Sequence, residues 1–120
     1  MIPREMSIDV IHTGTSKSAL KQIAASQFGD FVKAVVDVER GLMAIGGDLH
    51  ADEEAALLDI GSVQSNLWGI NLYPELPEDQ WVEFDSMINV RPSEGNRSRD
   101  VESPEIREKI LAIVGRLVQS

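Results

Sequence analysis

The chain contains no cysteine among its 120 residues. A disulfide framework, a thiolate zinc site, an iron–sulfur cluster and a cysteine nucleophile are therefore excluded. The sequence also has no apolar run near the roughly 20 residues of a membrane-spanning helix, and residues 1–11 lack the charged, apolar and small segments of a signal peptide. We expect a cytoplasmic protein with no membrane partner.

Basic residues are scarce, because 11 Lys and Arg stand against 20 Asp and Glu, a formal net charge of -9. This excess of negative charge opposes binding to a phosphate backbone, so nucleic acid is not an expected partner. Between Arg40 and Arg91 the sequence has ten acidic residues and no Lys or Arg. A solvated surface that aids solubility explains this acidic stretch, and a site for a cation or a basic protein is the alternative.

The sequence has no repeat, no low-complexity tract and no long Pro/Gly/Ser linker, so residues 1–120 are expected to form a single domain. Its 42% hydrophobic residues are enough for one core. Alternating apolar residues predict strands over residues 6–10, 31–38, 42–45, 67–73 and 81–90. Helical spacing and capping residues predict helices over 17–28, between 48 and 61, and from 104 onward.

The order of these elements, in which hairpins are followed by helices, predicts an α+β fold. The expected architecture is a mixed or mainly antiparallel sheet of four to five strands with about three helices packed mainly on one face.

The segment 81–90 is interpreted as the longest strand, and its outward face is expected to carry Glu83, Asp85, Asn89 and Arg91. Trp81 and Met87 share this face, so a helix, another subunit or a ligand is expected to cover them. Such polar groups on rigid strands, with Asn71 on a neighbouring strand, can orient a small polar ligand. A solvated sheet face needs the same residue types, which is the simpler explanation.

The loop 91–99 contains three arginines, Arg91, Arg97 and Arg99, together with Asn96 and Gly95. Arginine side chains match carboxylates and phosphates, and glycine lets backbone amides approach, so the loop can cradle an anion. Alternatively, these arginines pair with the acidic stretch and hold the last helix against the sheet.

Asp48, His50, Asp52 and Glu53 lie within six residues at the start of the second predicted helix. The three-residue spacing of His50 and Glu53 places them on one helix face, where Asp48 could complete a divalent-cation site. Capping and the helix dipole explain the acidic residues equally well. No metal site is predicted, and the sequence indicates no particular cofactor.

Three stretches carry a family resemblance: FGDFVKAVVDVERGLMAIGGDLHADEEAALL from position 28, GS and then NLWGINLYPE up to position 75, and WVEFDSMINVRPSEGNRSRDVESPEIREKI from position 81. Together they cover most of the chain from Phe28 onward. The chain resembles domain-of-unknown-function family 5674, a family of small uncharacterised prokaryotic proteins. The resemblance implies a cytosolic protein of bacteria or archaea, and it implies no activity, cofactor or catalytic residue.

Two classes of function stay open. The leading hypothesis is a non-enzymatic binding or interaction module, a homo-oligomer that uses the exposed sheet face around Trp81, Met87, Asp85 and Arg91. The alternative is a small enzyme or ligand sensor for an anionic or metal-bound small molecule, with a polar pocket built from Asp48, His50, Asp85, Asn89, Arg91, Asn96 and Arg97. A serine triad is not expected, because the sequence has no G-x-S-x-G motif and only two histidines.

Overall fold

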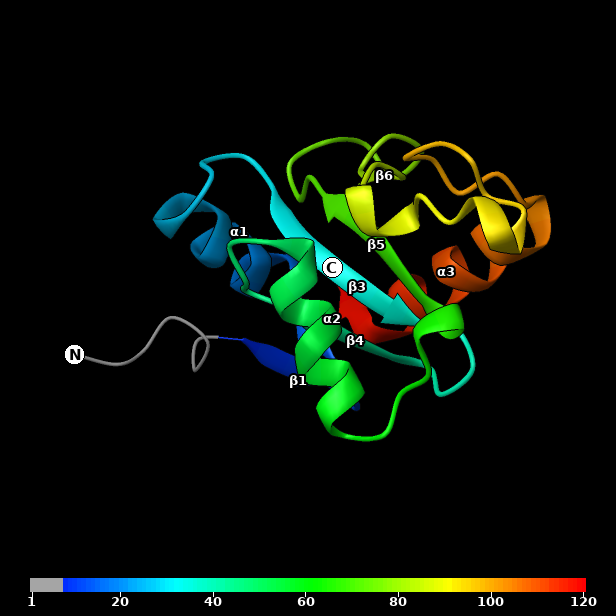
Figure 1. Ribbon diagram of the computed structural model, residues 1–120. Coiled ribbons are helices and arrows are strands. Elements are labelled where there is room, and N and C mark those ends of the chain that lie inside the picture. The colour runs from blue at the N-terminus through cyan, green and yellow to red at the C-terminus, as the bar shows by residue number, and fades with distance from the viewer. Residues whose placement is uncertain (1–7) are drawn as a thin grey trace.

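The computed structural model describes residues 8–120, which form three α-helices and a five-stranded antiparallel sheet with the strand order β1-β4-β3-β5-β6 (Figure 1). The strands of this sheet are β1 (Asp9–Ile11), β3 (Val32–Asp37), β4 (Leu42–Ile45), β5 (Leu67–Leu72) and β6 (Val82–Glu83). Two short strands, β2 (Thr15–Ser16) and β7 (Val118–Gln119), pair in parallel beside it. The predicted α+β class is confirmed; Met6, placed in the first predicted strand, lies outside the described residues.

The helices are α1 (Lys17–Ser26), α2 (His50–Asp59) and α3 (Pro104–Leu117), close to the predicted positions. The hydroxyl groups of Ser16 and Ser103 accept hydrogen bonds from the first turns of α1 and α3, as expected of capping residues. At the corresponding position of α2 stands Leu49, whose side chain accepts no such bond. The first N–H groups of α2 therefore lack a side-chain cap.

Alternation along β3 divides the core between the two faces of the sheet. Val32 and Val36 pack with α1 and α3, whereas Val35 packs with Leu57 of α2 on the opposite face. Two of the three helices thus lie on one face, and α2 crosses the other (Figure 1). Both faces are covered by the chain itself. No helix in residues 8–120 has the length and apolar character needed to cross a membrane.

The predicted hairpin of the second and third strands is confirmed, because β3 and β4 pair antiparallel. Gly41 in the turn has a φ of 69°, a left-handed conformation that favours glycine. The carboxylate of Asp37 accepts hydrogen bonds from the backbone N–H groups of Glu39 and Arg40, both at 2.9 Å. The backbone N–H groups of the turn are thus satisfied by a side chain of the same hairpin, which fits the tight turn that the sequence predicts.

The prediction of one long strand over 81–90 is wrong. Only Val82–Glu83 pairs with β5, after which the chain turns into the short helix η3 (Met87–Asn89). The side-chain amide of Asn89 accepts from the N–H of Gly69 at 2.8 Å and donates to the carbonyl of Gly69 at 3.0 Å. It therefore makes the hydrogen bonds to β5 that a continuing strand would have made.

Candidate functional site

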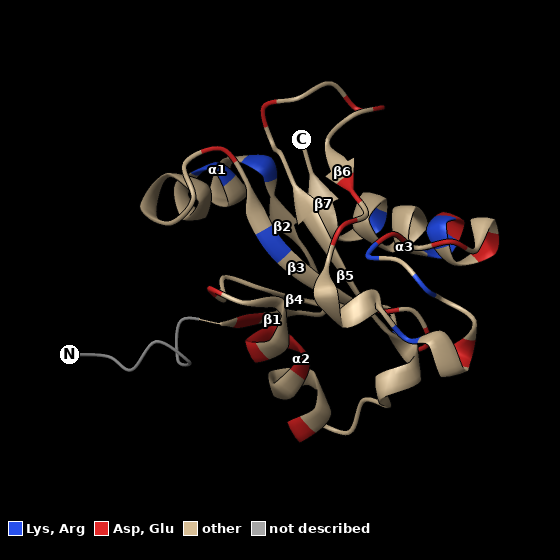
Figure 2. Ribbon diagram, turned by 45° about the horizontal axis from the view of Figure 1, so that its top comes forward, with Lys and Arg blue, Asp and Glu red and all other residues tan. Residues whose placement is uncertain are grey.

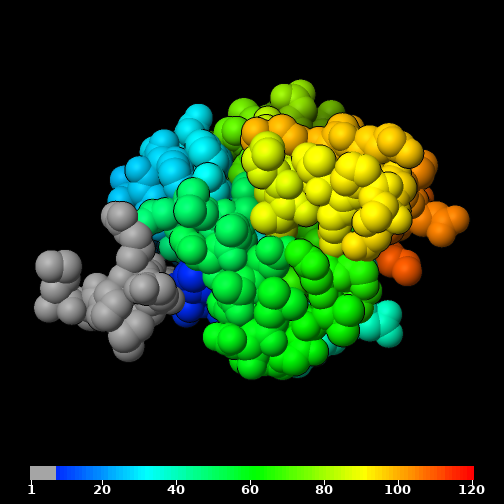
Figure 3. Space-filling view, in the orientation of Figure 1, coloured from blue at the N-terminus to red at the C-terminus, as the bar shows by residue number. Residues whose placement is uncertain are grey.

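A cavity of about 190 Å³ lies at the N-terminus of α2, between that helix and the segment that includes η3. Its polar lining residues are Lys33, His50, Ser86 and Arg99, and its larger apolar lining residues are Leu49, Met87 and Ile88. These residues come from β3, the start of α2, η3 with the residue before it, and the loop before α3. Figure 3 views the α2 side of the molecule, where the start of that helix lies beside the segment after β6. Four separate parts of the chain thus meet at one hollow.

His50 and Ser86 are the buried polar residues of this cavity, and His50 has 9% of its surface exposed. Its Nε2 lies 2.8 Å from the carbonyl oxygen of Ile70 on β5. Since a carbonyl can only accept, Nε2 carries the proton and Nδ1 of the neutral ring is left as an acceptor. Burial lowers the pKa of His50, against smaller upward effects that include the Ile70 carbonyl and Asp85. The imidazole is therefore held in its neutral form at pH 7.

Asn71 connects His50 with Glu83 of β6 and with Asp85, which follows that strand. Its Nδ2 donates to Glu83 Oε1 at 2.9 Å and to the backbone carbonyl of Asp85 at 3.2 Å. A side-chain hydrogen bond with Asn71 also raises the pKa of His50, though less than burial lowers it. The structure therefore brings three of the sequence-predicted residues, His50, Asn71 and Asp85, to the same place.

The charges around the cavity do not cancel. Arg99 Nε forms an ion pair with Asp85 Oδ1 at 2.6 Å, in which each charge is matched by the other. Lys33 is half-buried, and its Nζ lies 5.1 Å from the centre of the Phe28 ring. Within residues 8–120, no carboxylate forms an ion pair with Lys33. Lys33 is thus the lining residue whose charge is not matched by an ion pair among residues 8–120, while its Nζ lies near the Phe28 ring.

The positive charge does not come from α2 itself. This helix has acidic residues and no Lys or Arg (Figure 2). Lys33 reaches the cavity because residue 33 lies opposite Asn71 in the β3–β5 ladder, on the face that α2 covers. Sequence reasoning did not select Lys33, Leu49 or Ser86 as site residues. The register of β3 on β5 is the signal that would have identified Lys33, and it is not visible in the sequence.

Asn89 and Asn96 do not line the cavity; both hold the chain after β6 in place. Asn89 is fully buried on Gly69, as described above. Asn96 Nδ2 donates to the carbonyls of Asn89, Ser98 and Asp100 at 2.8, 3.1 and 2.7 Å. These amides satisfy backbone carbonyls that have no strand partner, so their role is to stabilise the fold.

Arg91 is also buried and lies outside the cavity. Its guanidinium donates to the carbonyls of Gln64 and Leu67 at 2.6 and 2.7 Å and stacks 4.1 Å from the centre of the Trp68 ring. Arg97 is exposed and contributes its backbone N–H to Glu102. The predicted anion cradle of the loop 91–99 is therefore not assembled as one cluster, and only Arg99 reaches the cavity.

The two residues predicted to share an exposed face, Trp81 and Met87, are separated by the turn into η3. Trp81 is 4% exposed and belongs to the core beneath α1 and α3, where the ammonium of Lys17 lies 4.6 Å from its ring centre. Met87 is 65% exposed at the edge of the cavity. The expectation of one exposed sheet face with both residues is wrong, because the segment is not a strand there.

The acidic residues near His50 do not form a cation site with it. In residues 8–120, no three His, Asp or Glu side chains are arranged to hold a metal ion. Glu53 is fully buried and accepts a hydrogen bond from the N–H of Gly47 at 2.9 Å. Burial raises its pKa well above the usual value. Asp48 is half-buried at a distance of 3.5 Å from Gln27 Nε2 and is not part of the cavity wall.

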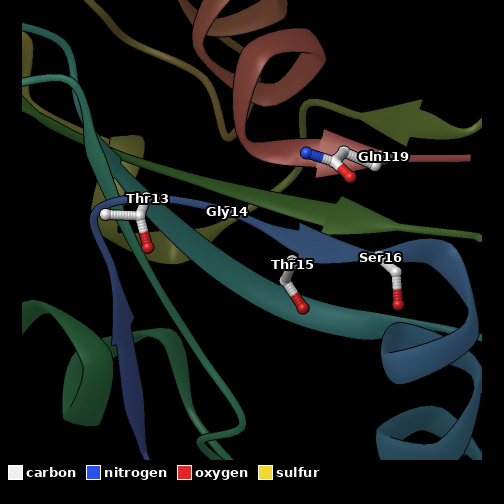
Figure 4. Close-up of a pocket in the computed structure, with 5 residues that line it drawn as sticks. All are labelled: Thr13, Gly14, Thr15, Ser16 and Gln119. Carbon is white, nitrogen blue, oxygen red and sulfur yellow. The ribbon is translucent and has the colours of Figure 1, made fainter.

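Two other hollows are larger, but neither is lined by a basic residue or a histidine. One, of about 320 Å³, lies beside β2 and β7 and is lined by Thr13, Gly14, Thr15, Ser16 and Gln119 (Figure 4). It offers hydroxyl groups and one amide but no charge. The other, of about 390 Å³, lies between Trp68 and the start of α3, and its charged residues are Glu94 and Glu102. Of the three, the cavity at the start of α2 is the one that combines an unmatched cation with a histidine.

Comparison with known proteins identifies a family but no activity. The family described as Protein of unknown function (DUF5674) matches residues 9–117, which include all three stretches that carry the sequence resemblance. No curated protein and no solved structure matches the chain. Because the match spans nearly the whole sequence, the chain belongs to the DUF5674 family of proteins of unknown function.

Proposed function

We propose that the protein binds a small anionic molecule in the cavity at the start of α2. The observation that carries this proposal is Lys33, a half-buried residue of the cavity wall whose charge has no carboxylate partner among residues 8–120. A cation without an ion-pair partner attracts an anion that comes close to it. An anion in the cavity supplies that counter-charge.

The start of α2 supports the same ligand chemistry. Leu49, His50 and Ala51 line the cavity, and Leu49 gives the helix no side-chain cap. The first N–H groups of a helix carry partial positive charge and lack intrahelical acceptors, so an anion near them is stabilised. This contribution adds to that of Lys33 and does not depend on it.

Arg99 offers a second cationic contact. Its Nε is used by Asp85, while its two terminal nitrogens form no hydrogen bond with the described residues. An arginine fixed at one nitrogen presents the remaining N–H groups in a defined direction. Arg99 is therefore held ready to bind an oxygen of the ligand.

The proposal is tested by mapping where an anion binds. Titration of the ¹⁵N-labelled protein with sodium acetate and with sodium phosphate is expected to shift the amide signals of Ala51, Met87 and Arg99 most strongly, with saturation on the order of 1 mM. Saturable shifts confined to the hollows beside β2 or Trp68, or shifts that rise linearly without saturation, would contradict the proposal.

A second candidate function is a contact with another protein, including a second copy of the chain. Leu49 and Met87 are 55% and 65% exposed and both border the cavity. Large exposed apolar side chains that lie together are typical of interaction surfaces. Native mass spectrometry of the untagged protein distinguishes the candidates. A monomer with a stoichiometric small-molecule adduct favours the anion site, and an adduct-free dimer that M87D dissociates favours the interface.

A further inference from the structure

We infer that the natural ligand of this cavity is a short aliphatic monocarboxylate with a chain of about four to six carbons. The inference rests on the proposed function, because it assigns the ligand class of the same cavity. It uses three independent features of the cavity: its size, the net charge of its wall and the position of its apolar residues.

The size of the cavity favours a small ligand. Since a water molecule occupies about 30 Å³ in the liquid, a cavity of about 190 Å³ holds roughly six waters. Sites that bury drug-sized ligands are usually about 300–1,000 Å³, so a nucleotide or a common cofactor would extend out of this cavity into solvent. A carboxylate with four to six carbons has about six to eight non-hydrogen atoms, which matches this space.

The charge of the wall matches one negative charge rather than two. Arg99 and Asp85 neutralise each other, and burial keeps His50 neutral, so Lys33 is the single unmatched cation. Glu83 lies close by, bonded to Asn71 and Tyr73. A doubly charged anion, such as hydrogen phosphate, would leave an excess negative charge beside Glu83 and Asp85, which is unfavourable. A carboxylate with one negative charge balances the positive charge of Lys33.

The apolar residues provide a place for a short chain. Leu49 and Met87 are largely exposed, and Ile88 joins them on the cavity wall. A carboxylate at Lys33 with an aliphatic chain against these side chains removes apolar surface of both partners from water. Methionine adapts well to chains of varied shape, since it is unbranched and flexible.

The test is a series of acids titrated into the intact protein at pH 7: acetate, butyrate, hexanoate and octanoate, with inorganic phosphate as the head group without a chain. Affinity is expected to rise roughly fourfold per methylene from acetate to hexanoate and then to stop rising, because the cavity is full. Phosphate is expected to bind more weakly than butyrate.

Substitutions of the apolar wall residues test where the aliphatic chain of the ligand lies. L49Q and M87Q are expected to flatten the dependence of affinity on chain length, because both substitutions replace an apolar side chain of the cavity wall with a polar one. L111Q removes a leucine of similar exposure, 47%, from the outer face of α3 and is expected to leave the whole series unchanged.

The outcomes separate the inference from the proposed function. A flat series, tighter binding of phosphate than of hexanoate, or a rising series that L49Q and M87Q do not affect overturns the aliphatic-acid inference, while anion binding itself still stands. If none of these anions binds, both the inference and the proposed function are overturned.

Discussion

The Nε2 atom of His50 lies 2.8 Å from the carbonyl oxygen of Ile70, so the first residue of α2 is hydrogen-bonded to the central part of β5. This bond fixes the imidazole tautomer and anchors the start of the helix above the sheet. It also keeps the cavity wall in place, because Leu49 and Ala51 flank His50 in the chain.

His50 is expected to make stability depend on pH. Burial lowers the pKa of His50 below its unfolded value of 6.5, so at acidic pH the unfolded state binds more protons than the folded state. The free energy of unfolding should therefore fall as pH decreases from 6.5 through the lowered pKa. Urea denaturation of the wild type and H50Q at pH 7, 6 and 5 should show a smaller loss for H50Q. The exposed His12 provides the control, and an H12Q profile equal to that of H50Q would contradict the assignment.

Glu53 is expected to have the opposite dependence. Burial raises its pKa well above 4.5, so the folded state holds the proton at pH values where the unfolded state has lost it. Stability should fall as pH rises from 4.5 through the raised pKa. E53Q resembles the protonated acid and should unfold at a higher urea concentration than the wild type at pH 7. E108Q, on the exposed surface of α3, should change little; equal effects of the two substitutions would argue against a buried proton.

Asn89 is expected to be essential for the chain after β6. N89A removes both hydrogen bonds to Gly69 and a third to the carbonyl of Arg99. Because buried partners are left unsatisfied, the free energy of unfolding should fall by about 2–4 kcal/mol. N66A is the matched control, since the side chain of Asn66 forms no hydrogen bond with the described residues and is only half-buried. Similar denaturation midpoints for N89A and N66A would be inconsistent with this structure.

Arg91 is expected to need its guanidinium and not only its charge. R91K keeps the charge but loses the two-pronged contact with the carbonyls of Gln64 and Leu67 and the stacking on Trp68. A loss of about 1–3 kcal/mol is expected in chemical denaturation. Trp68 fluorescence, recorded in a W81F background, should also change. An R91K protein with wild-type stability and unchanged fluorescence would show that the stacking contributes nothing.

The elements with local signals could be predicted from the sequence. Ser16 and Ser103 begin helices because their hydroxyl groups replace missing backbone acceptors, and this chemistry needs only the next three residues. The alternation of residues 32–36 identified β3 for a similar reason, since both faces of that strand are defined by its own side chains. The strand predicted over 81–90 is not formed at its end, because the side chain of Asn89, rather than a strand backbone, makes the hydrogen bonds to Gly69.

The candidate site could be predicted only in part. His50, Asn71 and Asp85 come from three segments, and their meeting depends on the pairing of β5 with β6 and the position of α2. Asn96 and Arg91 have the residue types of a binding site, yet they bind carbonyls of the same chain. A sequence does not distinguish a buried amide that binds the backbone from one that binds a ligand, because the hydrogen-bonding chemistry is the same.

The most direct test of the central claim, that Lys33 binds an anion at the start of α2, is the dissociation constant of butyrate for K33M and for K109M. Both substitutions remove one positive charge, but Lys109 lies on the exposed surface of α3, outside the cavity. K33M is expected to weaken binding at least tenfold, while K109M changes it less than twofold. Equal dissociation constants for the two variants would contradict the claim.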